Sequence, residues 1–333
     1  MDVFALTRTL MDIESTTGME AAVGNALADE LLALGYNVDR MPVEDDRFNV
    51  WATDPSHPNP ELVLSTHMDT VPPFIPSSET KDRIYGRGSC DAKGIIAAQI
   101  AAGEKLKSEG IYVGLLFLVG EERDSQGAQV ANQQPRGAKF LINGEPTENK
   151  LAIASKGTLR VELVARGRMA HSAYPELGES AIEKLLDAVE NVRRLKLPTN
   201  PKAGPCTMNI GMIEGGRAPN VIPDYACAHL LYRLVGSTQE LRRQITSAAG
   251  DKAEPNFILE IPYMEFTTVP GIATMIAAFT TDIPALTAWG RPLLIGPGSI
   301  HVAHTDGEYI EKGEMLEAID LYSRIASRLL GRH

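Results

Sequence analysis

His67 and Asp69 end a strand-like apolar run, residues 62–66, and their types and spacing suit a metal site. Side chains alternate along a strand, so both residues are expected on one face, where the carboxylate can hold one imidazole nitrogen and leave the other for a metal ion. Pro72 and Pro73 cannot continue a ladder of backbone hydrogen bonds, so the strand is expected to end here. A lone histidine at such a position is more often structural, so the interpretation depends on the rest of the chain.

Other acidic residues also follow predicted strands. Glu121 and Glu122 come after the apolar run 111–119, and Glu145 comes after the next predicted strand along the chain. In α/β sheets, ligands collect beyond the carboxyl ends of the strands. We therefore expect these carboxylates to lie near His67.

Five residues make a nitrogen and oxygen donor set that suits zinc and tolerates cobalt or manganese: His67, Asp91, Glu122, Glu145 and His304. Five ligands are too many for one catalytic zinc ion, but they suit two metal ions that share a carboxylate and a bridging water. Such a water needs a base, and Glu121 can take its proton without binding metal. Paired glutamates are otherwise typical of a solvated surface.

Alternating helices and strands are expected to position these residues. Apolar spacing predicts helices at 3–13, 19–34, 95–106, near 272–279 and 312–330, and strands at 48–52, 62–66, 111–119, 140–142 and 293–295. A short helix is expected soon after Glu122. This alternation indicates an α/β domain built around a largely buried sheet.

Residues 157–264 follow a different pattern. They predict strand, helix, strand, strand, helix and strand, which is the order of a ferredoxin-like α+β domain. A length of 333 residues suits two domains. We therefore expect an α/β domain formed by residues 1–156 and 265–333, with residues 157–264 inserted into it.

The composition excludes several classes of protein. A net charge of −11, from 32 basic and 43 acidic residues, makes nucleic acid and anionic membranes poor partners. No apolar run approaches the roughly 20 residues of a membrane span, and the first residues do not form a signal peptide, so a cytoplasmic location is expected. Three widely spaced cysteines argue against a disulfide framework and a cysteine-cluster zinc site.

Seven motifs occur along the chain, in the order HMDTVP, GRGSCDAKG, GEER, NGEPT, RMAHSAYP, GGRAPNVIP and AHTDGEY. Together they resemble the zinc-dependent family of aminoacylases, acetylornithine deacetylases, succinyl-diaminopimelate desuccinylases and glutamate carboxypeptidases. The resemblance covers nearly the whole chain. It implies a three-layer α/β/α catalytic domain with an inserted α+β ferredoxin-like lid, which usually also forms a homodimer.

The resemblance assigns the five donor residues to two metal ions that share Asp91, with His67 and Glu145 on one ion and Glu122 and His304 on the other. His304 is preferred over His301 because His304 stands in the sequence Ala-His-Thr and is followed by Glu308.

The same resemblance implies roles for the residues around the ligands. Asp69 would orient His67, and Glu121 would be the general base. The peptide bond between Asp91 and Ala92 is predicted to be cis, as it is in family members.

Three lid residues match functional positions of the family. His171 resembles a histidine that reaches a neighbouring subunit's active site and stabilises the oxyanion. Asn220 resembles a substrate-contacting residue, and Arg233 sits where family members hold the substrate carboxylate. Two departures from the family pattern are Leu231, where many members have an acidic residue, and Ser299 in the glycine loop, where many have an aspartate.

The expected activity is hydrolysis of a linear amide by a di-zinc enzyme. The predicted substrate is an N-acylated amino acid, which would lose its acyl group, and a dipeptide or a C-terminal peptide bond is the alternative. Two further interpretations are a non-catalytic binding module of this fold and a protein with a single metal ion or a purely structural metal site. A non-catalytic member would be expected to lack a ligand or the base, and none is missing. His57, His229 and His333 are interpreted as structural or solvated.

Overall fold

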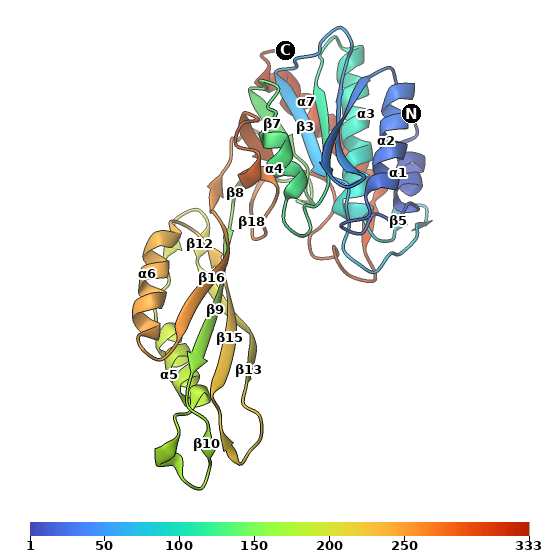
Figure 1. The fold of residues 1–333 in the computed structure, drawn as a ribbon. Helices are drawn as coiled ribbons and strands as arrows, with labels where there is room; N and C mark the ends of the chain where they lie inside the picture. The colour runs from blue at the N-terminus through green and yellow to red at the C-terminus, as the bar shows by residue number, and fades with distance from the viewer. Residues whose placement is uncertain (333) are drawn as a thin grey trace. The chain divides into compact units, whose positions relative to one another are not determined.

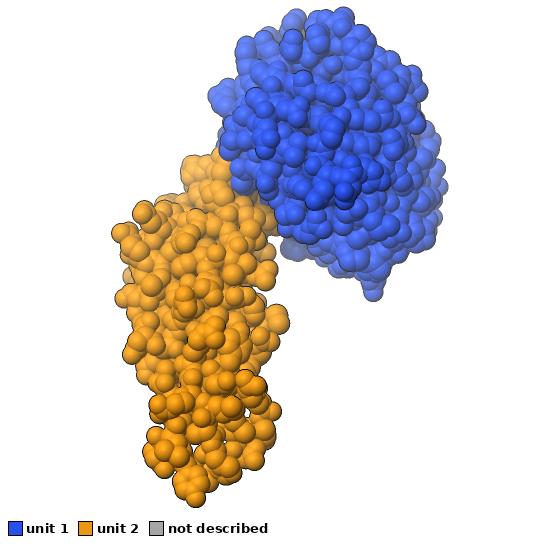
Figure 2. Space-filling model, in the orientation of Figure 1, with its two compact units in different colours: residues 1–153, 266–275, 281–333 blue, residues 154–265, 276–280 orange. Residues whose placement is uncertain are grey.

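The computed structural model describes residues 1–332, which form two compact units, coloured separately in Figure 2. Unit 1 comprises residues 1–153, 266–275 and 281 to the end of the described chain, and unit 2 comprises residues 154–265 and 276–280. His333, one of the histidines interpreted above as structural or solvated, lies outside the described residues.

A six-stranded sheet in the order β1-β2-β6-β3-β7-β19 forms the centre of unit 1 (Figure 1). Its strands are β1 (Asn37–Glu44), β2 (Arg47–Thr53), β3 (Leu62–His67), β6 (Gly114–Leu118), β7 (Phe140–Asn143) and β19 (Arg291–Leu294). β2 runs antiparallel to both of its neighbours, whereas β6, β3, β7 and β19 are parallel. Every residue of β3, β6 and β7 is buried, as expected for parallel strands covered on both faces.

Helices cover both faces of this sheet. The helices are α1 (Val3–Met11), α2 (Ala21–Ala33), α3 (Gly94–Ser108), α4 (Gln126–Asn132) and α7 (Lys312–Leu329). Leu64 and Leu115 share a core with α1, α2, α3 and α7, while Val63 and Leu116 pack with Trp289 and the buried alanines of α4. Alternate strand residues thus serve opposite faces, and the predicted three-layer α/β/α architecture is confirmed.

Unit 2 has the predicted ferredoxin-like element order. Its main strands and helices are β9 (Gly157–Arg166), α5 (Ala181–Arg193), β13 (Thr207–Gly215), β15 (Tyr225–Leu234), α6 (Thr238–Ala249) and β16 (Glu254–Ile261). The strands form an antiparallel sheet in the order β13-β15-β9-β16. Leu185 of α5 and Ile245 of α6 pack on the same sheet face as Leu163 and Leu230, which makes the core of this unit.

The helix predicted near residues 272–279 is wrong. The structure has strand β18 (Thr274–Ala277) there, in a three-stranded sheet with β17 (Met264–Glu265) and β8 (Leu151–Ser155). The Ala273 carbonyl accepts from the Leu151 N–H at 2.8 Å, and the Ala277 carbonyl accepts from the Lys156 N–H at 2.9 Å. The alanine-rich composition favours a helix only locally, and pairing with β8 overrides this weak preference.

The remaining elements are short. They are β4 (Ser78–Glu79), β5 (Arg83–Tyr85), η1 (Ser89–Lys93), β10 (Ala170–His171), η2 (Pro175–Leu177), β11 (Thr199–Asn200), β12 (Gly204–Pro205), β14 (Val221–Ile222), η3 (Ile283–Ala285) and β20 (Tyr309–Glu311). Within residues 1–332, no helix combines the length and the apolar character that crossing a bilayer requires.

Candidate metal centre

The strand order of unit 1 brings three predicted site segments to one edge of the sheet. β6, β3 and β7 are neighbouring parallel strands, so their carboxyl ends lie side by side (Figure 1). His67 is the last residue of β3, Glu121 and Glu122 follow β6 after a glycine turn, and Glu145 follows β7. The turn requires a left-handed backbone at Gly120, where φ is +80°.

Two histidines contact the same aspartate at this edge. The Nε2 atom of His67 lies 2.9 Å from Oδ1 of Asp91, and the Nε2 atom of His304 lies 3.3 Å from Oδ2 of the same residue. His304 Nε2 is also 3.0 Å from Oε1 of Glu122. Donor atoms of His67, Asp91 and Glu122 all lie within 4.8 Å of one another. The structure therefore brings four of the five predicted ligands into direct contact, with one oxygen of Asp91 facing each imidazole.

Glu145 and Glu121 add two more carboxylates to this cluster. Glu145 is only 4% exposed, and its Oε1 atom has no hydrogen-bond partner within residues 1–332. Burial raises the pKa of Glu145 well above its usual range, and the charge of His67 opposes this shift. Burial and the nearby charge of Glu145 likewise raise the pKa of Glu121. The site thus gathers more carboxylates than it has protein cations to balance them.

The imidazoles are polarised by these carboxylates. Hydrogen bonds with Asp91 and Glu122 raise the pKa of His304 to about 10. Burial opposes a charge on His67, but hydrogen bonds with Asp69 and Asp91 raise the pKa of His67 well above its usual range. Burial also opposes a charge on Asp91, yet its two histidine partners hold the pKa of its carboxyl below the usual value. In the metal-free protein, protons on the two histidines therefore compensate part of the negative charge.

Asp69 holds the backbone of the segment that follows β6. Its Oδ1 atom accepts from the N–H of Glu121 at 3.1 Å, and its Oδ2 atom accepts from the N–H of Glu122 at 3.2 Å. His67 Nδ1 lies 3.0 Å from the backbone oxygen of Asp69 and 3.5 Å from its carboxylate. The main-chain oxygen is thus the nearer partner of the ring nitrogen, and the carboxylate oxygens accept from the N–H groups of the loop.

The backbone around Asp91 and His304 is unusual. The peptide bond between Asp91 and Ala92 is cis, as predicted, within the short helix η1. His304 has φ at +64°, a left-handed conformation that is uncommon for residues other than glycine. A left-handed backbone at a residue other than glycine persists only where the surrounding structure enforces it, and such residues are common at functional sites.

Two acidic residues at the site were missed as functional candidates. Glu308 is buried, and its Oε1 atom accepts from the N–H groups of Cys90 and Asp91 at 3.2 and 3.3 Å. Its place four residues after His304 in the AHTDGEY motif is the sequence signal that could have found it. Asp282, which precedes η3, is 1% exposed, and burial raises the pKa of its carboxyl to about 7. No periodicity or motif quoted above points to Asp282.

The three predicted lid residues all lie in unit 2. His171 and Asn220 are neighbours, because β10 pairs with β14 and the N–H of Ser172 donates to the Asn220 carbonyl at 3.0 Å. Arg233 lies near the carboxyl end of β15, where its Nη1 atom donates to the Thr158 hydroxyl at 2.9 Å. Arg233 forms no ion pair with the acidic residues that the structure describes.

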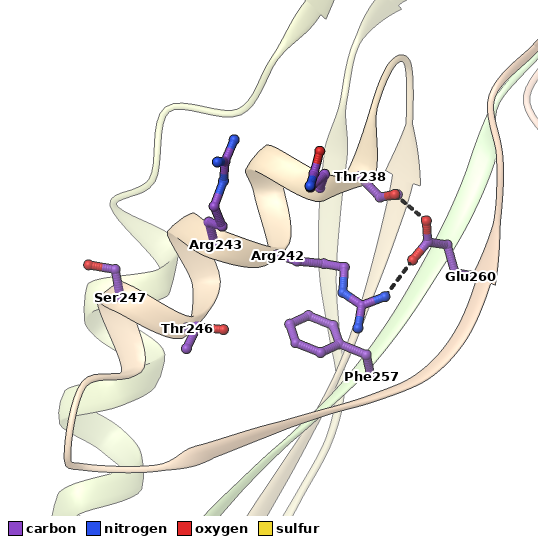
Figure 3. Close-up of a pocket in the computed structure, with 8 residues that line it drawn as sticks. Thr238, Arg242, Arg243, Thr246, Ser247, Phe257 and Glu260 are labelled. Atoms are coloured by element: carbon purple, nitrogen blue, oxygen red, sulfur yellow. Dashed lines mark hydrogen bonds and ion pairs between the residues drawn. The ribbon is translucent and has the colours of Figure 1, made fainter.

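A hollow of about 630 Å³ lies between α6 and β16 in unit 2 (Figure 3). The positive charge of Arg242 in this hollow is already balanced, because Arg242 Nη1 lies 2.9 Å from Glu260. The Arg242 guanidinium also stacks 4.3 Å from the centre of the Phe257 ring. The Thr238 hydroxyl also donates to Glu260. Among the residues that line this hollow, no uncompensated donor set compares with the cluster in unit 1.

Comparisons with known proteins place this chain among peptidases. A family model for the peptidase dimerisation domain matches residues 153–256. A probable carboxypeptidase of Aspergillus fumigatus is 39% identical over 378 aligned positions, which cover 98% of this chain and 86% of the relative. A peptidase M20 domain-containing protein of Schizosaccharomyces pombe is 39% identical over 337 positions, which cover 97% of this chain and 84% of the relative.

Solved structures share the fold at lower identity. Aminopeptidase PepT of Bacillus cereus has a TM-score of 0.82 at 20% identity, with 98% of each chain covered. A dinuclear metal-binding peptidase of the M20 family from Bacillus subtilis has a TM-score of 0.69 at 14% identity, with 99% of this chain and 98% of that chain covered. These structures show the fold, with its α/β catalytic domain and its dimerisation domain, and the two relatives show the family. This chain belongs to the M20 family of metallopeptidases.

Proposed function

We propose that unit 1 binds two divalent metal ions and hydrolyses the amide bond next to a free carboxylate group. The observation that carries the proposal is the contact of both histidines with one shared aspartate, beside further buried carboxylates. Unit 1 is accordingly the proposed catalytic domain and unit 2 the proposed lid and dimerisation domain. A cytoplasmic location stays a prediction from the sequence.

The donor set fits two metal ions. His67 and Glu145 would hold one ion, Glu122 and His304 the other, and both ions would share Asp91. The Oε1 atom of buried Glu145, which has no partner among the described residues, supports this assignment, because a buried carboxylate is costly unless a cation or a hydrogen bond compensates it. Nitrogen and oxygen donors favour zinc, with cobalt or manganese as alternatives.

Glu121 is the proposed general base. The bound metal ions would polarise the scissile carbonyl and acidify a water molecule. A carboxylate oxygen of Glu121 takes the proton of that water during the attack and then passes it to the leaving nitrogen. Burial and the nearby charge of Glu145 raise the pKa of the Glu121 carboxyl, a direction that favours a group which must accept a proton.

Arg233 is the proposed partner of the substrate carboxylate. It is half-buried, its side chain donates only to Thr158 among the described hydrogen bonds, and it has no acidic partner there. A guanidinium in this state is suited to a planar carboxylate. Asn220 is the proposed further substrate contact, from the neighbourhood of His171.

The name of the Aspergillus relative favours a C-terminal peptide bond as the bond that is cleaved. The resemblance of the motifs to deacylases supports an N-acylated amino acid as the second candidate. Both substrates present an amide next to a carboxylate, so the proposed residues serve either one.

A substrate panel would separate the two activities. The metal-loaded enzyme would be assayed on peptides and their C-terminal amides, on dipeptides, and on acetyl, succinyl and formyl amino acids. We expect cleavage of the free peptides and none of the C-terminal amides. Faster turnover of acyl amino acids than of any peptide would assign a deacylase, and cleavage of the amides at equal rates would contradict the role of the carboxylate.

The geometry of unit 2 supports action across two subunits. The β10–β14 pair continues the β9–β15 ladder beyond Tyr225, so His171 lies outside that end of the sheet. Arg233 lies about 25 Å from Tyr225 along β15, at the usual rise of a strand. One small substrate cannot contact both His171 and Arg233 of a single copy of unit 2. If both act on the same substrate, His171 must come from a second subunit, where it would stabilise the oxyanion.

The proposed dimer surface is the β13 edge with the adjoining face of α5. Met212 and Ile213 of the edge strand β13 and Leu186 of α5 are each more than half exposed. A groove of about 230 Å³ lies between β13 and α5, lined by Ile182 and Leu185 among others. An exposed apolar edge strand is a site for pairing with another chain, and a two-fold dimer would set the same edge of each copy together. The match to the dimerisation domain supports a second copy as the partner.

A further inference from the structure

We propose that Thr17 is a positioning residue for Glu121 and Glu122, acting through Asp69. The inference rests on the proposed function, since it concerns the segment that carries the proposed base and one proposed ligand. Thr17 lies between α1 and α2, outside the motifs that carry the family resemblance.

Asp69 is the point through which Thr17 would act. Its carboxylate is fully buried and accepts the Thr17 hydroxyl at 2.7 Å, which is shorter than its bonds from the N–H groups of Glu121 at 3.1 Å and Glu122 at 3.2 Å. Thr17 and Glu122 share the Oδ2 atom, while Glu121 uses Oδ1. The hydroxyl therefore fixes the rotation of the carboxylate plane that presents one oxygen to each N–H group.

The segment that carries Thr17 is attached to the turn that carries Asp69. The N–H of Thr70 donates to the Ser15 carbonyl at 3.0 Å, and the N–H of Thr17 donates to the Thr70 carbonyl at 3.2 Å. The Ser15 hydroxyl donates to the Met68 carbonyl at 2.9 Å. These bonds hold Thr17 in register with Asp69, so the contact between them does not depend on a flexible side chain alone.

The same segment also reaches the far end of the loop through a buried ion pair. Arg47 binds Glu20 through two bonds of 2.7 and 2.8 Å, and both side chains are at most 4% exposed. Glu20 also accepts from the N–H of Gly18 at 2.8 Å, and Arg47 Nη1 donates to Gln126 at 2.8 Å. Loop 120–126 is thus held near its start by Thr17 and Asp69 and at its end by Glu20 and Arg47.

Removal of the Thr17 hydroxyl would free the Asp69 carboxylate to turn. The N–H groups of Glu121 and Glu122 would then lose an acceptor with a fixed orientation, and the side chain of Glu121 would no longer be held toward the reacting water. Misplacement of a catalytic group by about 1 Å costs up to roughly 100-fold in rate. The effect is expected in kcat rather than in KM, because Thr17 itself does not contact the substrate in this proposal.

The test compares three variants of the full chain. Thr17→Val removes the hydroxyl at nearly constant shape, Thr17→Ser keeps it, and Thr16→Val is the matched control because Thr16 is not a donor to Asp69. The first readout is amide hydrogen exchange of residues 119–126 in the metal-free protein. We expect faster exchange there in Thr17→Val and wild-type exchange in Thr17→Ser and Thr16→Val.

The second readout is turnover of the metal-loaded enzyme. We expect kcat of Thr17→Val to fall about 10-fold to 100-fold with KM little changed, and Thr17→Ser to recover most of the loss. Unchanged exchange and kcat in Thr17→Val would overturn the proposal, as would faster exchange spread over the whole chain, which would indicate a general loss of stability. If the wild-type enzyme cleaves no amide at all, the proposed function fails, while the exchange experiment still decides the role of Thr17.

Discussion

Arg87 Nη1 lies 2.6 Å from Oε2 of Glu308, and neither side chain is more than 2% exposed. Arg87 also donates to the Thr305 carbonyl at 3.3 Å, next to His304, while the other oxygen of Glu308 accepts from the N–H of Asp91 at 3.3 Å. The pair therefore joins the two segments that carry the proposed bridging carboxylate and the proposed second histidine ligand. Neither residue needs to bind metal to control the spacing of the site.

The Arg87→Ala variant is expected to lose about 3–5 kcal/mol of unfolding free energy, because it leaves Glu308 buried without its ion-pair partner. Urea unfolding of the metal-free protein measures the loss. The matched control is Arg193→Ala, whose partner Glu190 lies on the same exposed helix surface, and its cost is expected to be about 0–1 kcal/mol. Equal losses in the two variants would show that the buried pair contributes no more than a surface pair.

Replacement of Glu121 by Gln tests the proposed base. We expect kcat to fall at least about 100-fold, the scale of general acid–base groups, while metal content stays at the wild-type level. Glu122→Gln is the matched control at the neighbouring position and should lower metal content, since Glu122 is a proposed ligand. Metal analysis and turnover of the two purified variants give both results. Wild-type turnover in Glu121→Gln would assign the base elsewhere.

The candidate ligands could be predicted from the sequence better than the residues that hold them in place. His67, Glu122 and Glu145 follow buried apolar runs, and parallel strands end at one edge, so their proximity could be expected before any coordinates. Whether these residues bind metal stays a prediction. The contacts of Thr17 and Glu308 join segments far apart in the chain, and no local pattern reveals such pairs.

Two elements show where local patterns fail. β18 has a helix-like composition but pairs with β8, so a tertiary contact decides its conformation. β1 was not predicted because it is an edge strand whose residues are mostly exposed, half of them polar, with a proline at position 42. Elements that bury both faces were predicted well, because their apolar residues dominate the pattern.

Metal binding is expected to tighten as the pH rises. The carboxylates of Asp91 and Glu122 raise the pKa of His304 to about 10, and the pKa of His67 is raised as well. In the metal-free protein these protonated imidazoles contribute stability below the usual histidine pKa of about 6.5, and for His304 this contribution is lost as the pH rises through about 10. A metal ion binds the neutral imidazole ring, so metal binding at any pH below the raised pKa of His304 must release protons.

Calorimetric titration with zinc in buffers of different ionisation enthalpy measures that proton release. His304→Ala should reduce the number released at neutral pH, whereas His301→Ala, the control in the same loop, should leave it unchanged. An affinity that is independent of pH between about 6.5 and 9 would contradict the coupling of the two histidines to the carboxylates.

The dimer surface can be tested with one charge on each edge of the unit 2 sheet. Ile213→Arg on β13 is expected to shift the protein from dimer to monomer, because the arginine would be buried against the second copy. Ile258→Arg is the matched control, since Ile258 is similarly exposed on β16, the opposite edge strand. Light scattering after gel filtration measures the mass of both variants. A dimer that persists in Ile213→Arg but dissociates in Ile258→Arg would move the interface to the β16 edge.

Mixing two inactive variants tests whether His171 acts on the other subunit. Glu121→Gln lacks the proposed base and His171→Ala lacks the proposed oxyanion donor, so each homodimer is expected to be nearly inactive. In a mixed dimer, one site receives Glu121 from one chain and His171 from the other. If His171 acts across the interface, mixing after dissociation and reassociation should therefore restore part of the wild-type turnover.

The required control is a mixture prepared with the dimer-disrupting Ile213→Arg change in both chains. This mixture should recover no turnover, because Glu121 of one chain and His171 of the other cannot meet without a dimer. If the variants exchange subunits but turnover stays at the level of the separate homodimers, His171 does not complete the partner's site. In that case the separation of His171 and Arg233 within unit 2 would mean that only one of them contacts the substrate.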